Sequence, residues 1–138
     1  MVEYYRDVAV GGSSPSYTPM LIDNQKLRIN WFPRKVYKYV NDIYGDLLTP
    51  FMSKKVHLGD WFVAEEKPQP TYSQGKTFFD KGFIHCFTTL NAARDFSWNY
   101  GTVVEAWIPP LVRVGLDPQT KQICAHRIYI TKKVHKLQ

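Results

Sequence analysis

The chain has 138 residues and a formal net charge of +6, with 44% apolar and 22% charged residues. This length allows one ordinary domain, and the composition excludes wholesale disorder. Because no run approaches 18 apolar residues, we expect no transmembrane helix and no membrane partner. The chain starts without the apolar core of a signal peptide, so we expect that the protein is not secreted.

Residues 1–25 are predicted to form an extended N-terminal arm. Residues 11–19 are rich in Gly, Ser and Pro, which favour turns and leave almost nothing to bury. Apolar residues flank this stretch on both sides, and a tail that stays in solvent would not be expected to contain them. The arm is therefore expected to dock on a partner through these anchors: Tyr4, Tyr5, Met20, Leu21 and Ile22.

Residues 26–138 are predicted to form one domain with a basic C-terminal end. Residues 27–32 alternate apolar and polar side chains, which is the period of a half-buried strand. A polar loop is expected over residues 65–76. Further apolar runs predict strands over the following ranges: 36–40, 47–52, 56–64, 82–87, 103–108, 111–114 and 123–131.

One helix is predicted, over about residues 89–100. Thr89 can cap its first turn by accepting hydrogen bonds from backbone amides. The residues expected on its buried face recur at helical spacing: Leu90, Ala93, Phe96 and Tyr100. Since strands surround a single central helix, we expect an α+β fold, with twisted and mainly antiparallel sheets and the helix packed at one side.

The two cysteines, Cys86 and Cys124, are too few for a disulfide framework. We expect both to be reduced and buried, and a single bridge between them is the alternative. A zinc site is not expected, because the adjacent His85 and Cys86 would point to opposite faces of a strand. The sequence also contains no Cys-x-x-Cys pair that would support such a site.

The run from Gly82 to Ala106, with Val36-Tyr-Lys-Tyr-Val before it, is similar to short uncharacterised proteins of phages and large DNA viruses. The similarity spans roughly residues 36 to 134. The same run resembles the strand–helix–strand middle of ADP-ribosyltransferase-like folds. The resemblance implies a virus- or phage-encoded protein of the host cytoplasm or the virion, with a capsid or host protein as its partner.

The second resemblance also implies an alternative activity, ADP-ribosyl transfer from NAD. Lys38 would stand where the first strand holds the dinucleotide, and His85 or Thr88 would stand on the middle strand. Glu105 would be the later carboxylate, but it lacks the paired Glu-x-Glu setting of the arginine-directed class. We therefore expect a likeness of fold, which does not carry function, and we expect no cofactor.

Two segments are strongly basic, since residues 24–41 and 118–138 each contain five cations and no acid. Residues 31–39 interleave aromatic rings with cations, a pattern typical of surfaces that bind single-stranded nucleic acids. A core strand with a basic outer face would look the same. The candidate phosphate contacts are Arg28, Arg34, Lys35, Lys38, Arg127, Lys132 and Lys133.

Three functional hypotheses follow from these patterns. The leading one is a non-enzymatic binding or assembly module that docks on a larger partner through its arm and basic faces. The alternative is an ADP-ribosyltransferase-like enzyme that uses NAD. The third is a small nucleic-acid-binding protein, whose affinity would depend on salt.

Overall fold

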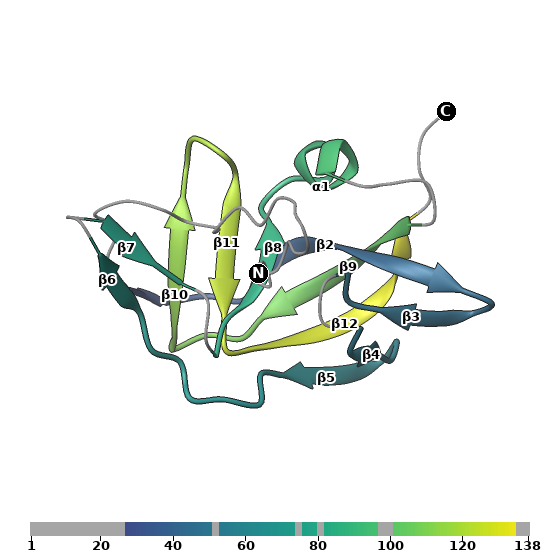
Figure 1. The fold of residues 1–138 in the computed structure, drawn as a ribbon, viewed down its shortest axis with the longest axis horizontal. Helices are drawn as coiled ribbons and strands as arrows, with labels where there is room; N and C mark the ends of the chain where they lie inside the picture. The colour runs from purple at the N-terminus through teal and green to yellow at the C-terminus, as the bar shows by residue number, and fades with distance from the viewer. Residues whose placement is uncertain (1–26, 51–52, 74–75, 80–81, 97–100, 135–138) are drawn as a thin grey trace.

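A computed structural model describes residues 27–50, 53–73, 76–79, 82–96 and 101–134 (Figure 1). The predicted arm of residues 1–25 lies outside the described residues. The elements are β1 (Arg28–Asn30), β2 (Arg34–Ile43), β3 (Asp46–Leu48), β4 (Lys55–Val56), β5 (Asp60–Val63), β6 (Thr71–Ser73), β7 (Lys76–Phe78), β8 (Ile84–Phe87), α1 (Leu90–Phe96), β9 (Gly101–Ile108), β10 (Val112–Asp117), β11 (Gln122–Ala125) and β12 (Arg127–Val134).

Ten of these strands form one sheet. Its order is β1-β10-β11-β8-β2-β9-β12-β5, and β3 and β4 branch from β2. Every neighbouring pair in the sheet is antiparallel. The strands β6 and β7 form a separate antiparallel hairpin that begins within the predicted polar loop of residues 65–76 and extends two residues beyond it.

The predicted α+β fold is wrong, because the described chain is mostly antiparallel sheet and contains a single short helix. The helix α1 has only seven residues, since the helical spacing of Leu90, Ala93 and Phe96 covers just two turns. Residues 97–100, the predicted remainder of the helix, lie outside the described residues. The Thr89 cap is confirmed, because the backbone amide of Ala92 donates to Thr89 Oγ1 over 3.1 Å.

The long strand β2 lies at the centre of the sheet. One of its edges pairs with β9 from Arg34 to Asn41, and the other is shared between β8 and β3. In Figure 1, β8, β10 and β11 run steeply across the direction of β2, β9 and β12. The sheet therefore turns back over itself and encloses one apolar core, as in orthogonal sheet packing.

We call the side of the sheet that faces this core the inner face, and the opposite side the outer face. Successive residues of a strand point to opposite faces. On β2, Val36 and Val40 are fully buried in the core, so the intervening Tyr37 and Tyr39 belong to the outer face. The core is built from β2, β9, β11 and β12, as five of its fully buried members show: Val36, Ile108, Ile123, Ile128 and Ile130.

The helix α1 covers part of the outer face. Ala93 is fully buried against Phe87 and Val103, and Leu90 and Phe96 are half-buried beside them. The ring centroid of Phe96 lies 5.4 Å from that of Phe87. The outer face is therefore apolar and covered beneath α1, while its other end, near Lys35, carries a different set of side chains.

Candidate functional site

Four side chains from four neighbouring strands lie side by side on the outer face. The strand register pairs Lys35 of β2 with Trp107 of β9, and Trp107 with Tyr129 of β12. It pairs Tyr129 in turn with Trp61 of β5. We call Trp107, Tyr129 and Trp61 the aromatic row. Because neighbouring strands lie about 4.8 Å apart, the row spans roughly 10 Å across the sheet.

The aromatic row is both ordered and accessible. The ring centroids of Trp61 and Tyr129 lie 5.3 Å apart at 71°, an edge-to-face contact. The Tyr129 hydroxyl donates a hydrogen bond of 3.0 Å to the carbonyl oxygen of Gly59. Trp61 is 47% exposed, and the other two rings are half-buried. The rings are thus held by their neighbours while they keep surface for a ligand.

Cations flank the aromatic row at both ends. Lys35 Nζ lies 5.6 Å from the ring centroid of Trp107, and Arg127 Cζ lies 5.9 Å from that of Trp61. Lys132 is exposed and stands opposite Glu105 in the register of β12 and β9. A ligand on the rings would therefore meet positive charge in each direction along the row.

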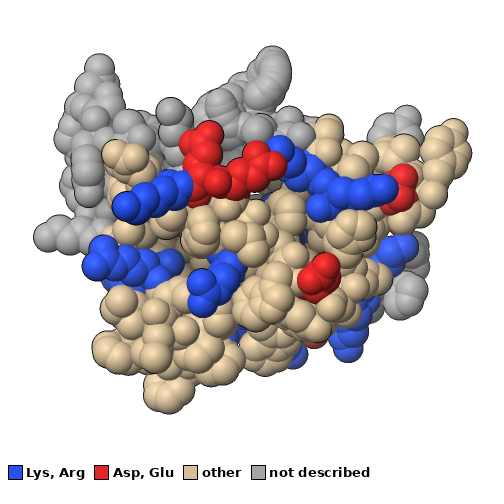
Figure 2. All heavy atoms as spheres, turned by 90° about the horizontal axis from the view of Figure 1, so that it is seen from below, with Lys and Arg blue, Asp and Glu red and all other residues tan. Residues whose placement is uncertain are grey.

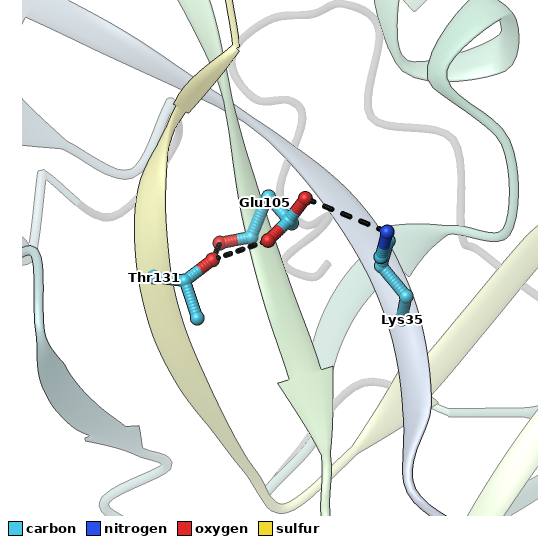
Figure 3. A network of polar contacts seen from close by, with 3 residues as sticks. All are labelled: Lys35, Glu105 and Thr131. Carbon is cyan, nitrogen blue, oxygen red and sulfur yellow. Dashed lines mark hydrogen bonds and ion pairs between the residues drawn. The ribbon is translucent and has the colours of Figure 1, made fainter.

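Glu105 stands two residues from Trp107 on the same face of β9, and its carboxylate is bound on two sides (Figure 3). The Thr131 hydroxyl lies 2.8 Å from Glu105 Oε2 and 3.0 Å from its carbonyl oxygen, and can donate to either. Lys35 Nζ lies 3.8 Å from Oε1. A register shift between Ile130 and Lys132 accompanies this contact. These contacts compensate much of the negative charge beside the rings.

Charge alone does not mark the site. On the face drawn in Figure 2, Lys and Arg side chains are spread in several groups, and acidic side chains lie between them. Several cations pair with such acids: Lys54 with Glu65, Lys55 with Asp46, and Lys133 with Asp42. The combination of rings with flanking cations therefore distinguishes the aromatic row from the rest of the basic surface.

Six of the seven predicted phosphate contacts are exposed: Arg28, Arg34, Lys35, Arg127, Lys132 and Lys133. The seventh, Lys38, is only 4% exposed and lies on the inner face. Lys133 Nζ donates a 3.0 Å hydrogen bond to Asp42 Oδ2, which lowers the pKa of that carboxyl. The structure thus brings only Lys35, Arg127 and Lys132 together with the aromatic row.

The four residues proposed for NAD chemistry do not converge on one site. Lys38 points into the core, whereas Glu105 stands on the outer face beside Thr131. The Thr88 hydroxyl donates to the carbonyl oxygen of Lys121. His85 is buried, and its pKa lies well below the ordinary value because burial disfavours the charged ring. Opposite faces of one sheet cannot hold a single substrate between Lys38 and Glu105.

Both cysteines are free and buried, as the sequence predicted. Burial raises the pKa of the Cys86 thiol to about 11 and raises that of Cys124 as well. Within the described ranges, no three His, Cys, Asp or Glu side chains lie close enough to hold a metal ion. Neither thiol is therefore placed to act as a nucleophile or as a ligand.

No family model, curated protein or solved structure matches the chain. The resemblances to viral proteins and to ADP-ribosyltransferase-like folds therefore stay predictions. A helix that could cross a membrane is absent from the part of the chain that the structure describes.

Sequence reasoning missed the aromatic row. Trp61, Trp107 and Tyr129 each lie in a segment that was predicted as a strand, but nothing in those segments shows which residues become cross-strand neighbours. Register depends on pairing between distant strands, and a shift of one residue would move Trp107 to the opposite face. The alternation around Trp107, between the buried Ala106 and Ile108, was the one local signal.

Proposed function

We propose that the protein is a non-enzymatic binding module and that its aromatic row binds a single-stranded nucleic acid. The observation that carries this proposal is the cross-strand alignment of Trp107, Tyr129 and Trp61 with Lys35 and Arg127 at their two ends. Bases stack on aromatic side chains whatever the nucleotide sequence, and cationic side chains contact the phosphates that link the bases. The net charge of +6 supports the approach of a polyanion.

Cross-strand aromatic pairs also stabilise sheets without any ligand. Two features favour a binding role over a purely structural one. Trp61 keeps 47% of its surface exposed on the edge strand β5, where packing does not require so large a ring. Both cations that lie over the rings are also exposed, and Arg127 stands opposite Val63 rather than opposite an acid.

The proposal is tested by fluorescence anisotropy with a labelled thymidine oligonucleotide of roughly twelve nucleotides. Trp61→Ala and Tyr129→Ala are each expected to weaken binding at least about fivefold, because each removes a stacking ring. With Lys35, Arg127 and Lys132 as phosphate contacts, log K should fall with log salt at a slope of about −2.

The matched control is Tyr44→Asn. Tyr44 is a fully exposed aromatic residue in the turn after β2, about 30 Å along the strand from Lys35. Asn tolerates the positive φ of 52° at this position. We expect its binding to equal that of the wild type. No binding at low salt, or equal losses in Tyr44→Asn and Trp61→Ala, would contradict the proposal.

Docking of residues 1–25 on a larger assembly is a second proposal and rests on the sequence alone. The same holds for a viral or phage origin and for a place in the host cytoplasm or virion. A capsid or host protein would bind residues 1–25, and the nucleic acid would bind the aromatic row, so the two proposals do not compete for one surface.

A further inference from the structure

A second group of exposed apolar side chains lies beside the Lys35 end of the aromatic row. Trp31, Phe32 and Leu111 are 66%, 78% and 68% exposed, respectively. Trp31 and Phe32 lie between β1 and β2, and Leu111 lies between β9 and β10. We call these three residues the apolar tip. Large apolar side chains this exposed mark contact sites when they are grouped.

The apolar tip is held in place by Asn30, which is only 7% exposed. Its side-chain Nδ2 donates a hydrogen bond of 2.8 Å to the carbonyl oxygen of Pro109. Its own carbonyl oxygen accepts a 2.5 Å hydrogen bond from the amide of Leu111. Leu111 has a φ of 65°, in the left-handed region that leucine rarely adopts. The β1–β2 connection is thus hydrogen-bonded to the β9–β10 connection, and these contacts hold Leu111 in its turn conformation.

The chain around the apolar tip carries only positive charge. Arg28, Arg34 and Arg113 are exposed, and Arg113 stands opposite Ile29 in the β1–β10 pair. Residues 27–41 and 106–116 contain no Asp or Glu. This composition suits a ligand that combines negative charge with flat apolar surfaces.

The apolar tip lies close to the aromatic row along both strands, since Phe32 precedes Lys35 by three residues and Leu111 follows Trp107 by four. Lys35 pairs with Trp107, and the next pair along the two strands is Arg34 with Ile108. Pro109, which accepts the Asn30 hydrogen bond, follows directly. The Arg34–Ile108 pair points to the inner face, so a chain that passes Lys35 on the outer face reaches the strand ends, where the apolar tip lies.

We infer that the apolar tip is a second stacking subsite of the same single-stranded nucleic acid. A strand that stacks on Trp61, Tyr129 and Trp107 passes its phosphates over Lys35 and rests further bases on Trp31 and Phe32. This inference depends on the proposed function of the aromatic row. The short separation from the row along both strands and the absence of acids from residues 27–41 and 106–116 favour a nucleic acid over a lipid surface or a protein groove.

The test compares thymidine oligonucleotides of roughly four and roughly twelve nucleotides, the range that single nucleic-acid-binding domains cover. We expect the wild type to bind the longer one at least about tenfold more tightly. The double variant Trp31→Ala/Phe32→Ala should lose this gain and bind the short oligonucleotide as the wild type does. Tyr44→Asn serves as the control and should keep the full gain.

The outcomes separate the two proposals. If the wild type binds neither oligonucleotide, the function of the aromatic row is refuted. If the wild type binds both and the double variant keeps the gain with length, only the second subsite is refuted. Sedimentation with phosphatidylserine vesicles provides the remaining comparison. A double variant that loses vesicle binding but keeps the gain with length would assign the apolar tip to lipid and overturn the inference.

Discussion

Lys38 Nζ donates a 2.9 Å hydrogen bond to the carbonyl oxygen of His85 from inside the protein core. The Lys38 side chain is 4% exposed and lies between Val36 and Val40, both fully buried. An ammonium group in such a place is costly unless it is hydrogen-bonded. The contact joins β2 to β8, the two strands at which the halves of the sheet meet.

Lys38→Ala is expected to lower the free energy of unfolding by about 2–4 kcal/mol, measured by urea denaturation. The change removes a charged hydrogen bond to His85 and leaves a cavity where the aliphatic stem packed. Lys132→Ala is the control, since Lys132 is exposed and its removal should change stability by less than about 0.5 kcal/mol. Equal effects of the two substitutions would contradict a structural role for Lys38.

His85 is expected to make the protein less stable as the pH falls. Burial, together with the repulsion of the Lys38 ammonium, holds the pKa of His85 well below its ordinary 6.5. Below about pH 6.5, His85 therefore binds a proton in the unfolded chain but stays neutral in the folded chain. The free energy of unfolding should be insensitive to this group above that pH and should fall below it, by at most about 1.4 kcal/mol per pH unit.

Urea denaturation of the wild type and of His85→Gln between about pH 7.5 and pH 5 measures this effect. The variant should lose most of the dependence on pH within this window. His57→Gln is the matched control, because His57 is exposed, and it should keep the slope of the wild type. If the free energy of unfolding falls with pH equally in the wild type and in His85→Gln, His85 is not the cause of the pH dependence.

The position of Lys38 shows what the sequence could and could not predict. Strand segments followed from runs and alternation, and the Thr89 cap followed from its place before Leu90. The two faces of β2 could not be told apart, because Tyr37 and Tyr39 are covered by α1 and Val36 and Val40 by the core. With apolar residues on both faces, alternation no longer shows which way a lysine points.

Predicting the aromatic row would have required knowing how distant strands pair. Trp61 and Trp107 lie 46 positions apart (107 − 61), and both become neighbours of Tyr129 through strand pairing. The same limit explains the fold class. A clear helical spacing was visible at Leu90 and Ala93, but the pairing of the remaining strands into one sheet was not.

Both thiols should be inert in the folded protein. Cys86 is 1% exposed with a pKa raised to about 11, and Cys124 is fully buried. At neutral pH neither presents a thiolate to a reagent. Ellman's reagent should detect no thiol in the native protein and both thiols after denaturation in guanidinium. Rapid reaction of one thiol before unfolding would show that the core opens locally.

Gly101→Ala is expected to destabilise the protein by about 1–3 kcal/mol, the usual cost of overpacking. A Cβ atom at this position would lie only 1.6 Å from the Tyr39 ring. That ring is 2% exposed, and its hydroxyl donates a 3.0 Å hydrogen bond to Asn41 Oδ1, so it has little room to move. Thermal melts beside the exposed-site control Asp95→Ala measure the loss, and matching melting temperatures would show that Tyr39 yields easily.

Glu105→Gln separates the binding proposal from the enzymatic alternative. Gln still accepts a hydrogen bond from Thr131, so we expect little change in stability. Loss of the negative charge frees Lys35 from its 3.8 Å ion pair and removes repulsion beside the rings. Lys35 is 45% exposed and Glu105 14%, and a long ion pair of this kind is worth up to about 1 kcal/mol, so the oligonucleotide should bind roughly two- to fivefold more tightly.

A transferase that relies on Glu105 predicts a different result. The wild type would then consume NAD, and Glu105→Gln would abolish that consumption without a gain in oligonucleotide binding. Anisotropy titrations and an NAD-consumption assay on the same two proteins measure both outcomes. Asp46→Asn, which raises the net charge by the same amount by removing the acid of the exposed pair with Lys55, controls for the change of net charge and should change neither readout by more than about twofold. Tighter binding by Glu105→Gln, with no NAD consumed by either protein, is the outcome we expect, because Glu105 lies beside the rings and on the opposite face from Lys38.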